Sequence, residues 1–189
     1  MKIRKQNIER RAVIEAYANY DCSKTSRPLP EFQTWDWSRA DAIDREMCRA
    51  HLKVGVPAGY QLWDEVEVTT SDLLECAVHD KIFPGQSRKL GRVAAGTLDC
   101  WKLKCDRPWY KGITSGQTLD ETAPMLLRPA VPAEFPARWY IEDGSGRAVA
   151  FVANQHSFNP SQTLAIGYLG CKPDPASSFM QDNFPGLLP

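Results

Sequence analysis

The stretch from Arg138 to Asn154, RWYIEDGSGRAVAFVAN, decides how this chain folds. Residues 138–141 include Trp, Tyr and Ile, which favour a strand, and residues 147–153 are suited to a helix. Between them lies the glycine-rich turn DGSG, residues 143–146. This turn is either the corner of a β-hairpin or a set of backbone N–H groups that holds a phosphate. Short glycine turns are common, so the stretch taken alone favours the hairpin.

The phosphate interpretation has a clear physical basis. Gly144 and Gly146 would let the backbone approach a ligand closely. A helix that begins at Gly146 or Arg147 would present free N–H groups and the positive end of its dipole to an anion. Arg147 could add a bidentate contact to a phosphate, and Ser145 could donate its hydroxyl. In a hairpin, by contrast, Arg147 would be only a surface cation.

Two carboxylates come directly before the turn. Glu142 and Asp143 could bind Mg²⁺ or orient a water molecule, so both are candidate catalytic and metal-binding residues. The sequence alone does not assign these two roles between them.

The overall composition is that of a soluble globular protein. The chain has 189 residues, of which 43% are hydrophobic and 24% charged. No apolar run approaches the roughly 20 residues that a membrane span needs. The start of the chain, MKIRKQNIERRAVIEAY, is charged and then amphipathic, so we expect neither a signal peptide nor a transmembrane segment.

The charge and the cysteines exclude some classes of protein. The 23 basic and 23 acidic residues cancel, which argues against a protein that grips a long DNA duplex. The basic residues concentrate in segments 1–11 and 86–111, whereas 36–80 is acidic. The six cysteines contain no Cys-x-x-Cys pair, so we expect reduced thiols in a cytoplasmic protein and no zinc site.

The hydrophobic pattern predicts a mixed α/β protein. We expect helices at 8–20, 38–54, from about 87, and 147–153, and strands at 60–70, 124–130, 138–141 and 163–170. Residues 71–78 are ambiguous between a short helix and a strand, and 106–117 are expected to form a loop. The predicted organisation is a helical extension at 1–60, a main domain at 61–175 and an irregular tail at 176–189.

The segments PMLLRPA (124–130) and RWYIEDGSGRAVAF (138–151) resemble the ParB/sulfiredoxin superfamily. In that superfamily a proline-bounded strand leads to a second strand, and then to a Gly-x-x-Arg turn that opens a helix and binds phosphates. The tetrad GSGR at 144–147 matches that turn position by position. The resemblance implies a mixed sheet with flanking helices.

A second loop extends the resemblance. The segment FPGQSRKL (83–90) is similar to the superfamily's other nucleotide-contacting loop, with Arg88 and Lys89 as its basic residues. The resemblance then covers roughly residues 65–170. It implies that Arg88 and Lys89 contact the phosphates together with the 144–147 turn.

Two departures narrow what the resemblance implies. Sulfiredoxins carry a reactive cysteine where this chain has Ser145, and a serine cannot form their thiosulfinate intermediate, which disfavours peroxiredoxin repair. The partition proteins add a helix-turn-helix DNA reader after this domain, and this chain has too few residues left for one. Chromosome partition by site-specific DNA binding is therefore disfavoured.

Within the superfamily, the run RPLPEFQTWDWSRADAIDREMC (27–48) and the DGSGRA segment are similar to the plasmid fertility-inhibition proteins, including those that suppress oncogenic DNA transfer. That resemblance implies a bacterial cytoplasmic protein, at or near the inner face of the membrane, that blocks conjugative or T-DNA transfer through a type IV secretion system. It also implies ATPase and DNase activity, with ATP and Mg²⁺ bound and the transferred DNA strand as a partner.

Two other hypotheses stay open. The chain could be a non-catalytic protein that occludes a secretion-system component or its protein cargo, or a nucleotide-operated switch that barely hydrolyses its ligand. For single-stranded DNA, the candidate stacking residues are Trp101, Trp109, Tyr110 and Trp139, although most such aromatics belong to the core.

Overall fold

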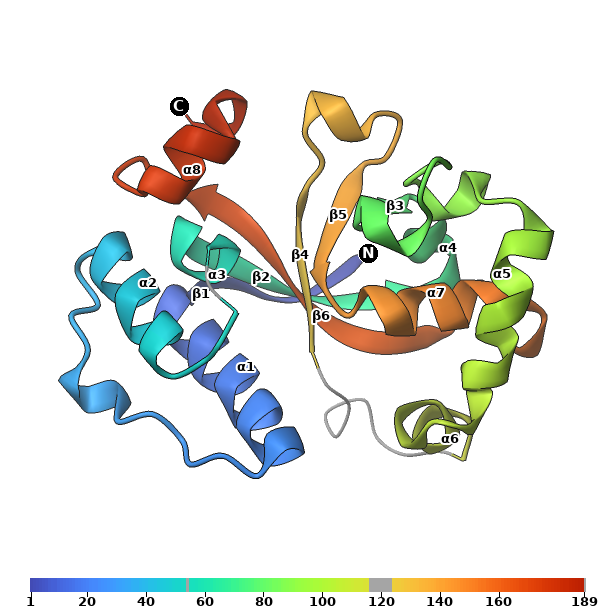
Figure 1. Cartoon of the computed structure of the whole chain (residues 1–189), viewed down its shortest axis with the longest axis horizontal. Helices are drawn as coiled ribbons and strands as arrows, with labels where there is room; N and C mark the ends of the chain where they lie inside the picture. The colour runs from blue at the N-terminus through green and yellow to red at the C-terminus, as the bar shows by residue number, and fades with distance from the viewer. Residues whose placement is uncertain (54, 116–123, 189) are drawn as a thin grey trace. The chain divides into compact units, whose positions relative to one another are not determined.

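A computed structural model describes residues 1–53, 55–115 and 124–188 (Figure 1). These residues form a mixed α/β structure, which confirms the predicted class. The strands are β1 (Lys2–Glu9), β2 (Tyr60–Thr69), β3 (Cys76–Ala77), β4 (Met125–Pro129), β5 (Trp139–Asp143) and β6 (Thr163–Pro173). The helices are α1 (Arg10–Thr25), α2 (Ala40–Arg49), α3 (Val56–Gly59), α4 (Thr70–Leu74), α5 (Ala95–Lys102), α6 (Pro108–Thr114), α7 (Ser145–Ala153) and α8 (Ser178–Asn183).

The strands form one mixed sheet in the order β1-β2-β6-β4-β5-β3. The chain divides into two compact units, the first made of residues 1–4 and 65–169 and the second of 5–64 and 170–189. Each unit has its own hydrophobic core and is described by itself.

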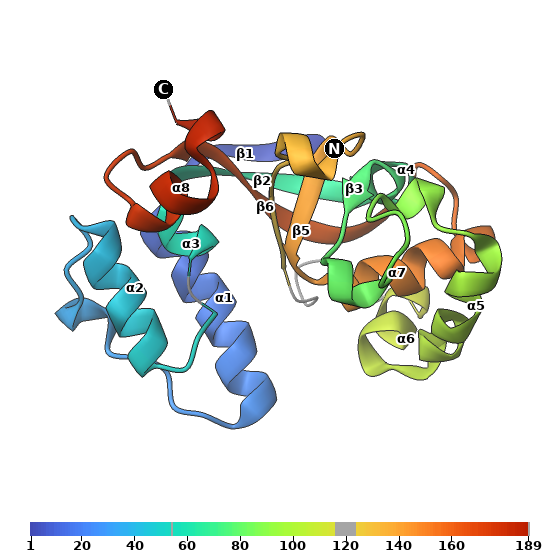
Figure 2. The ribbon, with the colours of Figure 1, turned by 45° about the horizontal axis from the view of Figure 1, so that its top comes forward.

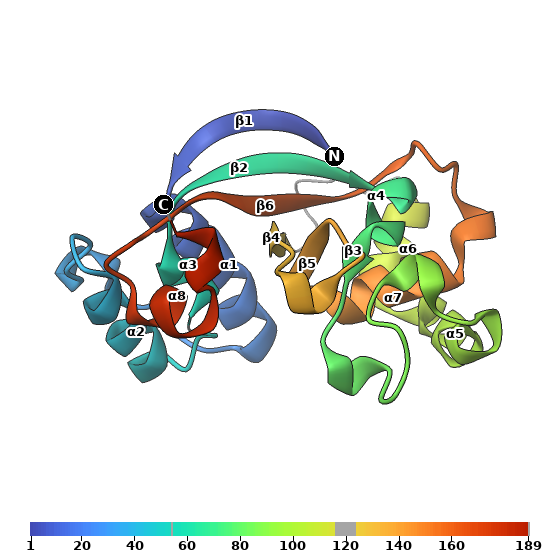
Figure 3. The same ribbon diagram turned by 90° about the horizontal axis from the view of Figure 1, so that it is seen from above.

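The first unit contains the glycine turn. Its β4 pairs antiparallel with β5 and parallel with β6, and β3 pairs parallel with β5. Helix α7 packs against α5 and α4, as Figures 2 and 3 show. The apolar side chains that fill this core come from the strands, from α4, α5, α6 and α7, and from loops, and include Val66, Leu127, Ile141, Val149 and Phe151.

A β-bulge interrupts the pairing of β4 with β5 at the end nearest the turn. Leu126 pairs with Asp143 and Leu127 with Ile141, so one step along β4 corresponds to two steps along β5. Glu142 is the extra residue. A bulge redirects the side chains around it, and such irregularities often lie next to functional sites.

The second unit packs α1 and α2 around a small core that contains Ile14, Ile43 and Met47. The buried Arg10, the first residue of α1, pairs with Asp174 and donates through Nε to the carbonyl of Tyr60 at 2.9 Å. This contact ties the start of α1 to the start of β2 and to the segment after β6.

The structure corrects several sequence-based expectations. Residues 2–9, part of the predicted helical extension, form an edge strand, and α1 begins only at Arg10. Residues 108–114 form α6 where a loop is expected, and the tail predicted to be irregular contains α8. The ambiguous segment at 71–78 contains most of a short helix, α4, and a short strand, β3.

None of the helices in the described part of the chain is both long enough and apolar enough to cross a membrane.

Candidate functional site

The glycine turn joins a strand to a helix, so the hairpin interpretation is wrong. Gly144 is the N-cap of α7 and lies in the left-handed region, with φ 97°. Its carbonyl accepts the first helical hydrogen bond, from the N–H of Ala148 at 3.0 Å. No side chain among the described residues caps this end of the helix. The first backbone N–H groups of α7 therefore have no intrahelical or capping partner.

Arg147 extends back over the turn. A Cβ atom placed on Gly144 would lie 3.0 Å from the Arg147 Nη2 and 2.9 Å from the Met125 Cγ. The same Nη2 donates to the carbonyl of Pro124 at 3.0 Å. The guanidinium is thus held at the N-terminal end of α7, where a side chain at position 144 would be strained by the positive φ and would crowd Arg147 and Met125.

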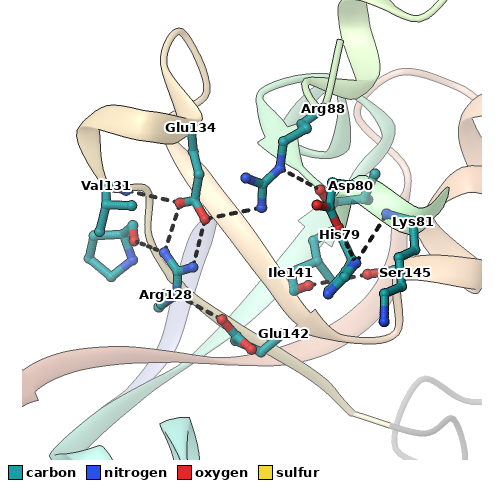
Figure 4. Close-up of polar contacts among 12 residues, drawn as sticks. His79, Asp80, Lys81, Arg88, Arg128, Val131, Glu134, Ile141, Glu142 and Ser145 are labelled. Carbon is teal, nitrogen blue, oxygen red and sulfur yellow. Dashed lines mark hydrogen bonds and ion pairs between the residues drawn. The ribbon is translucent and has the colours of Figure 1, made fainter. Parts of the chain in front are cut away.

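The side chain of Ser145, the first residue of α7, bonds back to the preceding strand β5. Its Oγ donates to the Ile141 carbonyl at 3.2 Å, which satisfies an acceptor at the end of β5 (Figure 4). The next residue, Gly146, lies beside the ring of Trp101, whose nearest atom would be 3.6 Å from an added Cβ.

A buried arginine on β4 organises the neighbouring charges. Arg128 is only 2% exposed. Its Nη1 and Nη2 donate to the two carboxylate oxygens of Glu134 at 2.8 and 2.7 Å, and its Nε donates to Glu142 at 2.8 Å (Figure 4). This network connects the β4–β5 loop, where Glu134 lies, to the bulge that carries Glu142.

An aromatic ring lies against this network. The guanidinium of Arg128 is 4.1 Å from the ring centroid of Tyr140, its partner across the β4–β5 ladder, and that of Arg88 is 5.4 Å away. Burial, followed by the charge of Glu142, raises the pKa of Tyr140 despite the nearby Arg88. Burial alone would lower the pKa of Arg128, but its hydrogen bonds and ion pairs with Glu134 and Glu142 raise it overall.

The two predicted phosphate-binding cations of the 83–90 loop have carboxylate neighbours. Arg88 donates through Nε to the Val78 carbonyl at 3.3 Å, and its Nη2 lies 3.6 Å from Glu134. Lys89 pairs with Glu75 at 2.7 Å. The structure brings Arg88 into the Arg128 network, whereas Lys89 pairs at the edge of β3.

The two candidate carboxylates differ in their surroundings. Glu142 is bound to Arg128. Asp143 is half-buried, and its side chain makes no hydrogen bond or ion pair with any other residue that the structure describes. Of the two, Asp143 is therefore the carboxylate at the start of the turn whose charge stays available.

A metal site made of protein ligands alone is not present among residues 1–53, 55–115 and 124–188, since no three His, Cys, Asp or Glu side chains lie close enough to share an ion. Mg²⁺ usually needs only one or two carboxylates when the substrate supplies phosphate oxygens. Asp143 fits that limited requirement.

Most of the candidate stacking aromatics belong to the core. Tyr110 is buried against Phe151 and Phe158. Trp101 and Trp139 are half-buried and pack on the first unit's core. The side chain of Trp109 lies outside the described residues.

Sequence reasoning missed Arg128, Glu134 and Tyr140 as members of the site. One signal was visible: an arginine within the apolar strand PMLLRPA must be paired if that strand is buried. No sequence pattern identified its two carboxylate partners, which lie 6 and 14 residues away.

Comparison with known proteins gives no match: neither the protein-family models, nor the curated proteins, nor the solved structures contain a significant relative of this chain.

Proposed function

We propose that this chain binds a nucleotide through the N-terminus of α7 and hydrolyses it, as the ParB/sulfiredoxin resemblance implies. The observation that carries the proposal is the left-handed Gly144, which opens an uncapped helix with the Arg147 guanidinium held beside it. Uncapped N–H groups, the helix dipole and a fixed cation together favour a phosphate.

The roles follow from the surroundings of each residue. The N–H groups of Gly146 and Arg147 bind phosphate oxygens, and the Arg147 guanidinium stabilises the negative charge that develops during transfer. Asp143 orients the attacking water because its carboxylate has no cationic partner among the described residues. Glu142 holds the bulge through Arg128 and acts as a positioning residue.

Asp143 is also the residue that would hold Mg²⁺ together with the ligand's phosphate oxygens. A bound Mg²⁺ would neutralise part of the phosphate charge.

The same groups suit a phosphodiester, so we extend the proposal to cleavage of DNA. The biological role that the resemblance implies is fertility inhibition, in which the protein blocks conjugative or T-DNA transfer through a type IV secretion system by acting on the transferred strand. The balanced net charge suits a short, local grip on that strand.

The test measures ATP hydrolysis and cleavage of labelled single- and double-stranded DNA, with Mg²⁺ and with EDTA. Arg147→Ala and Asp143→Asn should each lower turnover by about a hundredfold without changing the unfolding midpoint. The matched control is Arg45→Ala, which removes an exposed, ion-paired arginine of α2 in the second unit.

Absence of both activities in the wild type would overturn the proposal. Turnover by the Arg147→Ala and Asp143→Asn variants equal to that of the wild type would also overturn it. The hypothesis of a non-catalytic protein that occludes a secretion-system component or its cargo would then take its place.

A further inference from the structure

The loop between β4 and β5, residues 130–138, is held firmly. Glu134 accepts two hydrogen bonds from the buried Arg128 and a third from the N–H of Val131 at 2.9 Å. Backbone bonds close the loop from Ala130 N–H to the Arg138 carbonyl at 3.1 Å and from Ala137 N–H to the Glu134 carbonyl at 3.0 Å. A buried charged carboxylate, 5% exposed, thus fixes the conformation of a surface loop.

The residue directly after this anchor is an exposed aromatic. Phe135 is 83% exposed, the most exposed large hydrophobic side chain in the described part of the chain. A ring on a fixed loop loses little conformational entropy when a ligand covers it. Single exposed hydrophobic residues are common, so exposure of Phe135 alone does not indicate a binding site, and the rest of the loop has to be considered.

The same loop and the residues bound to it carry cations stacked on other aromatic rings. Arg138 closes the same loop, is exposed, and places its guanidinium 5.5 Å from the ring centroid of Trp139. Among the described residues Arg138 forms no ion pair. Arg88, which is bound to the loop through Glu134, lies over Tyr140.

The charged groups that these contacts link to the loop leave a net positive charge. Four cations meet three carboxylates there, which leaves one positive charge over: Arg88, Lys89, Arg128 and Arg138 against Glu75, Glu134 and Glu142. The excess charge belongs to Arg138, because each of the other three cations lies within 4 Å of a carboxylate.

We infer that the 130–138 loop is a contact site for single-stranded nucleic acid, in which a base stacks on Phe135 and Arg138 binds the adjoining phosphate. Exposed rings interleaved with cations are the usual means of binding unpaired strands without sequence preference, because every base has a π-face. A duplex keeps its base faces stacked inside and would leave Phe135 unused. The loop lies at the start of β5, whereas the nucleotide site lies beyond its end at Gly144. The inference specifies the DNA form that the proposed function would use, but it needs no hydrolysis.

The experiment is equilibrium binding of a fluorescein-labelled oligothymidylate of about 20 nucleotides, followed by anisotropy with EDTA and without nucleotide. Phe135→Leu and Phe135→Ser should each weaken binding about tenfold, whereas Phe135→Trp should keep it within about twofold. Leu103→Ser is the matched control, since Leu103 is 80% exposed but lies outside this loop, and it should bind like the wild type.

The leucine variant distinguishes stacking from apolar docking. If Phe135→Leu binds as well as the wild type, or if the wild type does not bind the oligonucleotide, the inference is wrong, and a protein partner becomes the occupant to test. Because the assay contains no substrate, its result is independent of turnover. Binding that depends on Phe135 in a protein without ATPase or DNase activity would uphold this inference and overturn only the proposed function.

Discussion

At the scale of single residues, Arg128 is the side chain on which the geometry of the site depends. A buried guanidinium is tolerated only when its hydrogen bonds are satisfied, and here two carboxylates and the carbonyl of Pro129 satisfy them. The three acceptors belong to different parts of the hairpin. One side chain therefore holds the loop, the strand and the bulge in a single arrangement.

Replacing Arg128 should be costly. Arg128→Ala leaves Glu134 and Glu142 without their buried cation, and we expect the free energy of unfolding to fall by about 3–5 kcal/mol in urea titrations. Arg138→Ala, which removes an exposed arginine from the same hairpin, should change it by less than about 0.5 kcal/mol. Equal losses of unfolding free energy in the two variants would show that the ion pairs of Arg128 do not stabilise the fold.

A second residue-scale prediction concerns Asp44 on α2. Burial raises the pKa of its carboxyl, although the N–H of Gly55 donates to it at 3.1 Å. A folded-state pKa above the unfolded value of 3.8 means that the associated stability is present below 3.8 and is lost as the pH rises through the folded pKa. Asp44→Asn, which can still accept from Gly55, should thus stabilise the protein at pH 7.

Chemical denaturation at pH 7 and at pH 3 checks this sign. The stabilisation by Asp44→Asn should shrink toward zero at the lower pH, where the wild-type carboxyl is protonated in both states. A variant that is less stable than the wild type at pH 7 would contradict the assignment.

Whether the sequence could predict a residue of the site depends on how far along the chain its partners lie. Arg128 and the GSGR tetrad at 144–147 stand out locally, because an arginine in an apolar strand and a glycine pair before an arginine are visible patterns. The partner Glu134 is not visible, because it reaches Arg128 only after the hairpin has formed. The sequence also does not show that Arg128 donates a hydrogen bond to Glu142 and not to Asp143.

At the scale of elements, the transition from β5 to α7 is the critical one. Gly144 has φ 97°, and an added Cβ would meet both Met125 and Arg147. Gly144→Ala should cost about 1–3 kcal/mol of stability and displace Arg147. Gly96→Ala is the control, because Gly96 lies in α5 with nothing within 4 Å of an added Cβ, and it should be neutral or stabilising by about 0.5–1 kcal/mol.

Thermal unfolding and nucleotide binding of the two glycine variants check this prediction. A Gly144→Ala variant as stable as the wild type would mean that the left-handed conformation is not required.

The elements that sequence reasoning missed share a weak hydrophobic pattern. Strand β1 is almost entirely exposed, so KIRKQNIE has no alternation of buried and exposed residues to detect. Its charges suit an edge strand, which must avoid pairing with other chains. Helices α6 and α8 are 7 and 6 residues long, too short for a periodic signal, and depend on tertiary packing. The buried strands β2, β4 and β6 had strong patterns and were predicted correctly.

At the scale of the whole molecule, the zero net charge limits how the protein can bind nucleic acid. Each phosphate neutralised on a single strand contributes about −0.7 to the slope of log K against log salt. A local contact in which Arg138 binds one phosphate should give a slope of about −0.7, measured from oligothymidylate binding at several NaCl concentrations. Arg138→Ala should reduce the magnitude of the slope by about 0.7, which brings it close to zero. A slope steeper than about −5 would require a long basic track instead.

The central claim is that the backbone N–H groups at the start of α7 bind phosphate. The most direct measurement is a ¹H–¹⁵N NMR titration of the wild type with a non-hydrolysable ATP analogue and, separately, with inorganic pyrophosphate. We predict that the largest amide shifts occur at Ser145, Gly146 and Arg147 with both ligands. Arg147→Ala should lower the affinity for both ligands at least tenfold. Saturating ligand that leaves these three amides unmoved, or that shifts another surface instead, would contradict the claim.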